Sequence, residues 1–123
     1  MDKGYLETLF TINGKTAVVT GGGGILCSSL SNVLARLGVR VAVLDILEEA
    51  AQKVVDGIQA GGHEALAVRC DVLERASIEA AAEKVVQVYG PVDFLINGAG
   101  GNKKQATTSL NLSFFDLPQE AIQ

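Results

Sequence analysis

Several residue types are scarce in this chain of 123 residues: tryptophan is absent, histidine and methionine occur once each, and cysteine, proline and tyrosine twice each. Cys27 and Cys70 lie far apart and form no C-x-x-C pair, and we interpret them as reduced, cytosolic thiols. His63 stands beside two glycines and is interpreted as a solvated turn residue. No metal site is predicted.

Positive charge and long apolar runs are also scarce. The net charge is −4 and no basic cluster is longer than Lys103-Lys104, so neither nucleic acid nor an anionic membrane is expected as the main partner. No apolar run approaches the roughly 20 residues of a membrane span. The start of the chain, MDKGYLETLF, lacks the features of a secretory signal. We expect a cytoplasmic protein that acts on a small-molecule substrate.

Glycine is abundant, with 14 residues, and glycines separate short apolar runs from segments of helical periodicity. The apolar runs predict strands over residues 16–20, 39–45, 64–71 and 92–97. Apolar residues about one turn apart predict a helix after each of the first three strands: Leu26, Leu30, Val33, Leu34 and Leu37; Leu47, Ala51, Val54, Val55 and Ile58; Ile78, Ala82, Val85, Val86 and Tyr89. This order indicates an α/β fold, a doubly wound parallel sheet with strand order 3-2-1-4.

The length suits one domain, and we interpret residues 1–123 as a single nucleotide-binding domain. After Asn97 the alternating pattern gives way to a polar loop. Asp116 and Pro118 then have the character of a helix start, close to the end of the chain. We therefore expect the chain to be a truncated domain, that is, the amino-terminal half of a complete one.

Four consecutive glycines join the first predicted strand to the first predicted helix. Glycine accepts a positive φ and carries no Cβ, so such a turn can approach a phosphate closely. The following helix offers free N–H groups and a partial positive charge to the anion. A flexible turn without a ligand is the alternative, and a mononucleotide P-loop is not expected because no lysine follows the glycines. The predicted phosphate-binding residues are Gly21, Gly22, Gly23, Gly24, Ile25 and Leu26.

Asp45 ends the second predicted strand, 21 residues after Gly24. A carboxylate there can accept hydrogen bonds from adenosine ribose hydroxyls. It would repel a 2′-phosphate by about 4 kcal/mol per unit charge at ~4 Å and an effective dielectric constant of about 20. No arginine or lysine lies between Lys15 and Arg36 or between Asp45 and Lys53. The sequence therefore favours NAD over NADP, with capping of the next helix as the alternative role of Asp45.

Polar and glycine-rich segments follow the third and fourth predicted strands as well. An aspartate after the third strand can accept a hydrogen bond from an adenine amino group, and glycines after the fourth let the backbone approach a ribose. Because ligands bind at the carboxyl ends of the strands in this architecture, both segments are expected beside the glycine turn. The additional predicted cofactor-binding residues are Asp71, Val72, Asn97, Gly98, Ala99 and Gly100.

Together these segments resemble the short-chain dehydrogenase/reductase family. TGGGGILC is similar to its T-G-x-x-x-G-x-G motif, VLD to its NAD-selecting strand end, CDV to its adenine-contacting D-V pair, and DFLINGAG to its D-x-L-V-N-N-A-G segment. The resemblance covers about residues 10–123 and implies a Rossmann fold, an NAD cofactor and the interconversion of an alcohol and a carbonyl. Ile25 and Cys27 stand where the motif has glycine, and Gly98 replaces its second asparagine.

The family's proton chemistry uses a serine, a Tyr-x-x-x-Lys pair and a helix asparagine, and the lysine lowers the pKa of the tyrosine. Neither Tyr5 nor Tyr89 is followed four residues later by a lysine, so no catalytic residue is predicted. TGGGGILC together with INGAGGNKKQATT is most similar to members of the D-mannonate oxidoreductase (fructuronate reductase) type, which implies a sugar-acid substrate.

Two hypotheses of function follow. The chain is the cofactor-binding half of an NAD-dependent oxidoreductase that is homo-oligomeric at full length, or it is a non-catalytic nucleotide-binding module.

Overall fold

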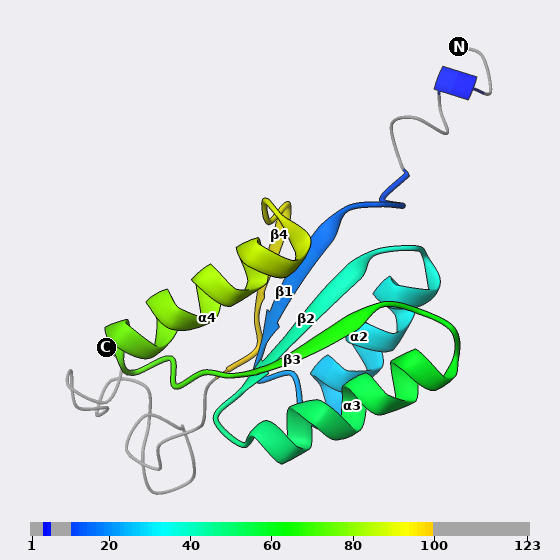
Figure 1. Ribbon diagram of the computed structural model, residues 1–123. Helices are drawn as coiled ribbons and strands as arrows, with labels where there is room; N and C mark the ends of the chain where they lie inside the picture. The colour runs from blue at the N-terminus through cyan, green and yellow to red at the C-terminus, as the bar shows by residue number, and fades with distance from the viewer. Residues whose placement is uncertain (1–3, 6–10, 100–123) are drawn as a thin grey trace, which may run out of the picture.

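The computed structural model describes residues 4–5 and 11–99. Strands and helices alternate along the chain as β1 (Thr16–Thr20), α2 (Ile25–Arg36), β2 (Arg40–Asp45), α3 (Glu48–Ala60), β3 (Ala65–Arg69), α4 (Arg75–Tyr89) and β4 (Phe94–Asn97) (Figure 1). The predicted alternation is confirmed, with β1 at its predicted bounds. The helix start predicted at Asp116 and Pro118 lies outside the described residues.

The four strands form one sheet in the order β3-β2-β1-β4. All three strand pairs are parallel, which confirms the predicted topology. Thr20 of β1 is paired with Leu44 of β2 and with Asn97 of β4, and Asp45 is paired with Arg69 of β3. The carboxyl ends of all four strands therefore meet at one edge of the sheet.

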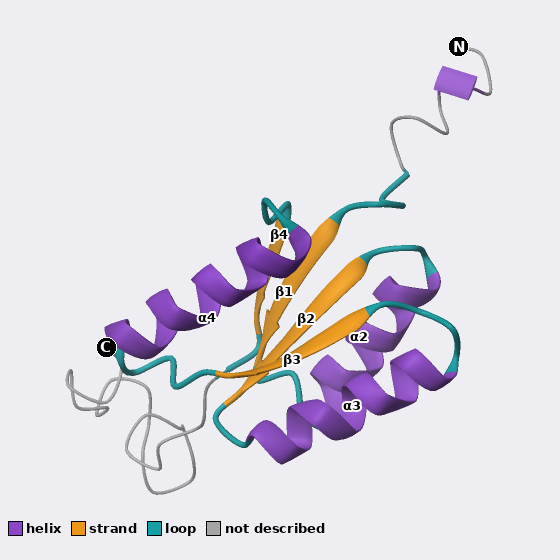
Figure 2. Ribbon diagram, viewed as in Figure 1, coloured by secondary structure: helices purple, strands orange, loops and turns teal. Residues whose placement is uncertain are grey.

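Helices cover both faces of the sheet. Figures 1 and 2 show α2 and α3 on one face and α4 on the other. Side chains alternate between the faces along each strand, so Val19 and Val43 pack in the cluster on the α2/α3 side, whereas Val18 and Leu44 pack in the cluster that includes α4. Burial on both faces explains why the strands are continuous apolar runs.

Helix α2 turns a different face to the sheet from the one that its leucines predict. Leu26 is 81% exposed, and the buried residues are Cys27, Ser31 and Ala35. These three lie one turn apart and have small side chains, so the helix can approach the strands closely. The predicted leucine stripe is therefore wrong as the core face, although Leu34 from it packs against the core.

The predicted faces of the other two helices are closer to the structure. Ala51, Val55 and Ile58 of α3 are buried, as predicted. In α4 Val85 is buried as predicted, but Ala81 takes the place expected for Ala82. Since alanine carries little hydrophobic signal, periodicity alone does not separate adjacent alanines.

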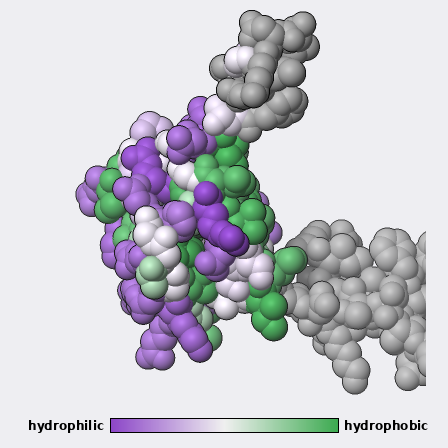
Figure 3. All heavy atoms as spheres, turned by 90° about the vertical axis from the view of Figure 1, so that its right-hand side faces the viewer, coloured by the Kyte–Doolittle hydropathy of each residue, from purple (hydrophilic) through white to green (hydrophobic). Residues whose placement is uncertain are grey.

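Apolar residues also gather on the outer surface. Figure 3 views the side on which α2 and α3 lie in Figure 1, and it shows a band of apolar residues beside a hydrophilic region. Exposed apolar side chains on α2 include Ile25, Leu26 and Val33. No helix among residues 4–5 and 11–99 is long and apolar enough to cross a bilayer.

Candidate functional site

The turn after β1 is shaped by its contact with the loop after β4. Gly21 has a φ of +62°, a region that L residues rarely adopt. A Cβ at Gly21 would lie 2.7 Å from the carbonyl oxygen of Gly98 and 2.8 Å from the backbone nitrogen of Ala99. The fold itself therefore requires a glycine at the first position of the turn, before any ligand is considered.

The other glycines of the turn differ in how much space surrounds them. A Cβ at Gly22 would lie 2.5 Å from Cγ1 of Val43, and a Cβ at Gly23 would lie 2.9 Å from Oδ2 of Asp45. At Gly24 the nearest atom would lie 3.4 Å away, an ordinary van der Waals contact. Three of the four glycines are thus needed for packing within the protein, which is a reason for glycine that is independent of the predicted phosphate.

The amino terminus of α2 comes directly after the glycine turn. Gly24 is its N-cap, in an extended conformation and without a side-chain capping bond. The backbone N–H of Ser28 donates to the carbonyl oxygen of Gly24 at 2.8 Å, so the N–H groups of Ile25, Leu26 and Cys27 precede the first intrahelical bond. The first turn carries no acidic residue. Its N–H groups and the positive end of the helix dipole suit an anion.

The Asp45 carboxylate is fixed by two backbone hydrogen bonds. Oδ2 accepts one from the N–H of Gly23 at 3.0 Å, and Oδ1 accepts one from the N–H of Leu47 at 2.9 Å. Leu47 is the N-cap residue of α3, so the bond to its N–H corresponds to the alternative, capping role. The same carboxylate lies against the glycine turn, and each oxygen retains a further lone pair for a ligand.

Asp71 and Val72 lie in the loop between β3 and α4. Asp71 is partly buried, and its Oδ1 accepts a hydrogen bond from the N–H of Leu73 at 3.0 Å. Its backbone N–H donates to Oγ of Ser77 at 2.8 Å. Val72 is exposed. The structure thus brings this predicted pair to the same sheet edge, with one carboxylate oxygen of Asp71 already bonded within its own turn.

Thr20 holds the loop after β4. Its Oγ1 accepts hydrogen bonds from the N–H groups of Gly98 at 3.1 Å and Ala99 at 3.2 Å. The N–H of Gly98 also lies 3.1 Å from the carbonyl oxygen of Thr20. Asn97 and Gly98 are exposed at this edge, whereas the predicted Gly100 lies outside the described residues. Thr20 is the first residue of the TGGGGILC segment but was not among the predicted site residues, although a threonine at the end of a strand before glycines is a visible signal.

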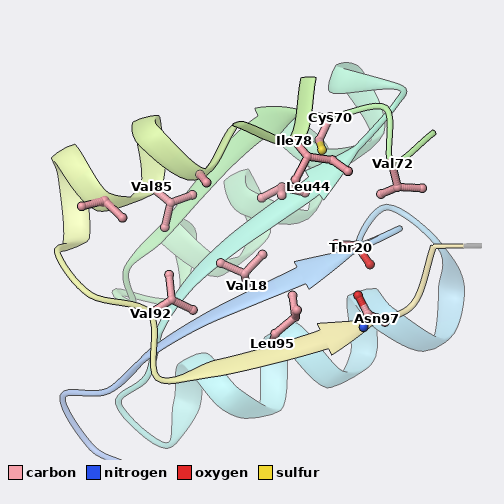
Figure 4. Close-up of a pocket in the computed structure, with 12 residues that line it drawn as sticks. Val18, Thr20, Leu44, Cys70, Val72, Ile78, Val85, Val92, Leu95 and Asn97 are labelled. Carbon is pink, nitrogen blue, oxygen red and sulfur yellow. The ribbon is translucent and has the colours of Figure 1, made fainter. Parts of the chain in front are cut away.

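A groove of about 490 Å³ opens beside these residues, between α4 and the sheet. Figure 4 shows Thr20 and Asn97 close together at the strand ends, with apolar side chains such as Val18, Val85 and Leu95 further along the groove. Its walls are mostly apolar, which is typical of sites for small organic molecules.

Arg69 is a second residue that the sequence analysis missed. It ends β3, is exposed, and is the register partner of Asp45. Paired residues of adjacent strands project from the same face of a sheet. The structure therefore places a guanidinium side chain on the strand next to the Asp45 carboxylate, although the two residues are far apart along the chain.

Tyr89 belongs to the opposite edge of the molecule. It ends α4, and the guanidinium carbon of Arg40, the first residue of β2, lies 5.7 Å from the centre of its ring. Burial raises the pKa of Tyr89 above its usual value, and the charge of Glu64 raises it further, whereas Arg40 lowers it. This phenol is therefore remote from the carboxyl edge that carries the glycine turn.

No cluster of three or more His, Cys, Asp or Glu side chains suited to a metal occurs among the residues that the structure describes.

The family of the chain follows from comparison with known proteins. The sequence model of the short chain dehydrogenase family matches residues 15–117. The chain therefore belongs to the short-chain dehydrogenase/reductase family. Its Rossmann-type sheet and the glycine turn at the carboxyl edge agree with that assignment.

Individual relatives of known sequence align with most of this chain. "Uncharacterized oxidoreductase UxuB" of Bacillus subtilis is 47% identical over 117 residues, which are 89% of this chain and 42% of the relative. The 7alpha-hydroxysteroid dehydrogenase of Escherichia coli K12 is 39% identical over 90 residues, which are 73% of this chain and 35% of the relative. The chain thus spans less than half the length of the curated relatives that it matches.

A solved structure is also similar to this chain. A Haemophilus influenzae protein described as a candidate D-mannonate oxidoreductase, solved with bound NAD, superposes with a TM-score of 0.76 and 34% identity. The match covers 95% of this chain and 45% of that protein.

Proposed function

We propose that the chain is the NAD-binding part of an oxidoreductase that interconverts an alcohol and a carbonyl, with a sugar acid such as D-mannonate or fructuronate as substrate. The observation that carries the proposal is the position of the Asp45 carboxylate against Gly23, beside the free N–H groups at the start of α2. A carboxylate for ribose hydroxyls and N–H donors for a pyrophosphate are the two groups that a dinucleotide requires. The sugar-acid substrate is supported by the name of the Haemophilus influenzae structure.

The proposal gives each predicted residue a role in binding. The glycine turn, Gly21–Gly24, and the backbone N–H groups of Ile25 and Leu26 hold the pyrophosphate. Asp45 accepts hydrogen bonds from the adenosine ribose and Asp71 from the adenine amino group, beside Val72. The loop of Asn97, Gly98 and Ala99 would lie along the second ribose, and the same role is proposed from the sequence for Gly100, which lies outside the described residues.

NAD, when bound, supplies the acceptor for a hydride. The residues of this chain bind and orient it, and the sequence contains no Tyr-x-x-x-Lys pair for the accompanying proton transfer. We therefore propose that the 123-residue chain binds NAD without turnover of its own. Cytoplasmic location and homo-oligomerisation of the full-length protein remain predictions.

Calorimetry and an absorbance assay on the purified chain test the proposal. We expect NAD to bind with one site per chain and more tightly than NADP, with no NADH formed from D-mannonate. Absence of NAD binding would overturn the cofactor assignment, and NADH formation that scales with chain concentration would overturn the inactivity. A reading frame that continues into a Tyr-x-x-x-Lys pair favours the oxidoreductase over a non-catalytic binding module.

A further inference from the structure

The sulfur of Cys27 lies against the backbone of Gly98. A Cβ placed on Gly98 would overlap Sγ of Cys27, whereas it would lie 3.6 Å from the Cβ of Cys27, an ordinary contact. Cys27 is only 8% exposed, in the first turn of α2. The sulfur atom of Cys27, and not the rest of its side chain, therefore lies with the carbonyl oxygen of Thr20 in the space that a side chain at position 98 would need.

The loop that carries Gly98 is held firmly at this contact. The backbone N–H groups of Gly98 and Ala99 both donate hydrogen bonds to Thr20, and these bonds tie the loop to the end of β1. From the other side, Gly21 has no room for a Cβ because of the carbonyl oxygen of Gly98. A group inserted between Cys27 and Gly98 would therefore displace the loop at the cost of these hydrogen bonds.

Two of the three departures from the family motif meet in this contact. The motif has glycine where this chain has Cys27, and asparagine where this chain has Gly98. One position has gained a side chain and the facing position has lost one. A side chain gained at one position and lost at the facing one is the pattern that close packing of an interior favours.

We propose that Cys27 and Gly98 form a size-matched pair in which Cys27 is a positioning residue of the dinucleotide site. Its sulfur sets the distance between the loop after β4 and the first turn of α2, and the absence of a side chain at position 98 is the condition for that distance. The inference rests on the proposed function, because the same loop and turn are the ones assigned to the cofactor.

Paired variants of the 123-residue chain test the matching. Gly98→Ala should weaken NAD binding about tenfold, equivalent to ~1.4 kcal/mol. A Cβ at position 98 would also lie 2.7 Å from the carbonyl oxygen of Thr20, so the loop must shift even without the sulfur and part of the loss remains in any variant with Gly98→Ala. Cys27→Ala combined with Gly98→Ala should bind NAD at least about threefold more tightly than Gly98→Ala alone, because the contact with the sulfur is relieved while that with Thr20 remains, and contacting residues couple by up to ~3 kcal/mol.

Two further double variants separate size from other effects. Cys27→Ser with Gly98→Ala keeps an atom in the place of the sulfur and should bind NAD as weakly as Gly98→Ala alone. Cys70→Ala with Gly98→Ala removes the other buried thiol, which packs in the cluster on the opposite face of the sheet, and should give no recovery. Midpoints of thermal unfolding are measured on all variants, at concentrations used for calorimetry, and should follow the same pattern.

The outcomes distinguish this inference from the proposed function. NAD binding by the unchanged chain that falls in Gly98→Ala and recovers in part only with Cys27→Ala supports the pair. If the unchanged chain binds NAD but Cys27→Ala gives no recovery in affinity or unfolding midpoint, or Cys70→Ala recovers as much, the pair is wrong while the cofactor assignment stands. If the unchanged chain binds no NAD, the proposed function fails, and the positioning role fails with it.

Discussion

At the scale of single residues, we expect cofactor choice to depend on two residues that are paired in strand register. Asp45 carries the charge that disfavours a 2′-phosphate, and Arg69 on the neighbouring strand carries the charge that would favour one. The carboxylate is held by Gly23 and Leu47 beside the glycine turn, whereas Arg69 is exposed. We therefore expect the fixed carboxylate to dominate, so that the chain prefers NAD to NADP as long as Asp45 is present.

Removing that carboxylate should narrow the preference for NAD. In Asp45→Ala we expect NAD binding to weaken about 10- to 100-fold, because hydrogen bonds to charged groups contribute ~1.5–3 kcal/mol. NADP binding should weaken less or become tighter, because Arg69 then acts unopposed. Calorimetry with both cofactors measures this, and Asp45→Ala with Arg69→Ala is the control that should lose the relative gain for NADP. An equal loss for both cofactors in Asp45→Ala would remove Asp45 from the ribose role.

The four glycines of the turn should respond differently to alanine. Gly21→Ala combines a positive φ with contacts under 3.0 Å and should reduce the free energy of unfolding by about 1–3 kcal/mol. Gly24→Ala adds a Cβ into available space and should change it by less than ~0.5 kcal/mol. Urea denaturation of the two variants measures the difference. Similar losses in both would show that the turn is not held by the loop after β4.

At the scale of elements, α2 shows how the sheet selects a helix face. Small side chains at Cys27, Ser31 and Ala35 allow close packing, and larger ones turn outward. Ala35→Leu should therefore destabilise the fold by about 1–3 kcal/mol through overpacking. Val33→Lys, on the apolar stripe of the sequence, should change stability by only ~0.5 kcal/mol, since Val33 is half exposed. The reverse order of these effects in urea denaturation would restore the leucine stripe as the core face.

The same contrast explains what the sequence could and could not predict. Strand positions, their order and the shared edge follow from continuous apolar runs and the rule for parallel sheets, and β1 was predicted to the residue. The face of α2 could not be predicted, because a small buried residue such as Ser31 carries no hydrophobic signal. Arg69 was missed because its position opposite Asp45 depends on strand register, which proximity along the chain does not reveal.

At the scale of the whole molecule, β4 leaves an apolar edge. Within the described part of the chain β4 pairs with β1 alone, and its Phe94 and Leu95 are 36% and 60% exposed. Unpaired strand edges recruit other chains. We therefore predict that the isolated 123-residue chain self-associates through this side. Light scattering, with intact mass on the same sample, should give a mass above 12.8 kDa.

A charged residue on the edge provides the control for that prediction. Leu95→Lys should reduce the association, because lysine on an edge strand opposes pairing with another chain. A folded, monodisperse monomer of 12.8 kDa at high concentration would contradict the prediction and show that the four-stranded sheet is self-sufficient.

The most direct test of the central claim is a titration of the isotope-labelled chain with NAD, followed by the amide resonances. A dinucleotide at the carboxyl edge should shift the amides of Gly21–Leu26, Asp45, Asp71–Val72 and Asn97–Ala99, and leave those of Arg40 and Tyr89 at the opposite edge unchanged. Shifts confined to other residues, or no shifts at NAD concentrations that saturate relatives of this family, would contradict the claim that this edge is a dinucleotide site.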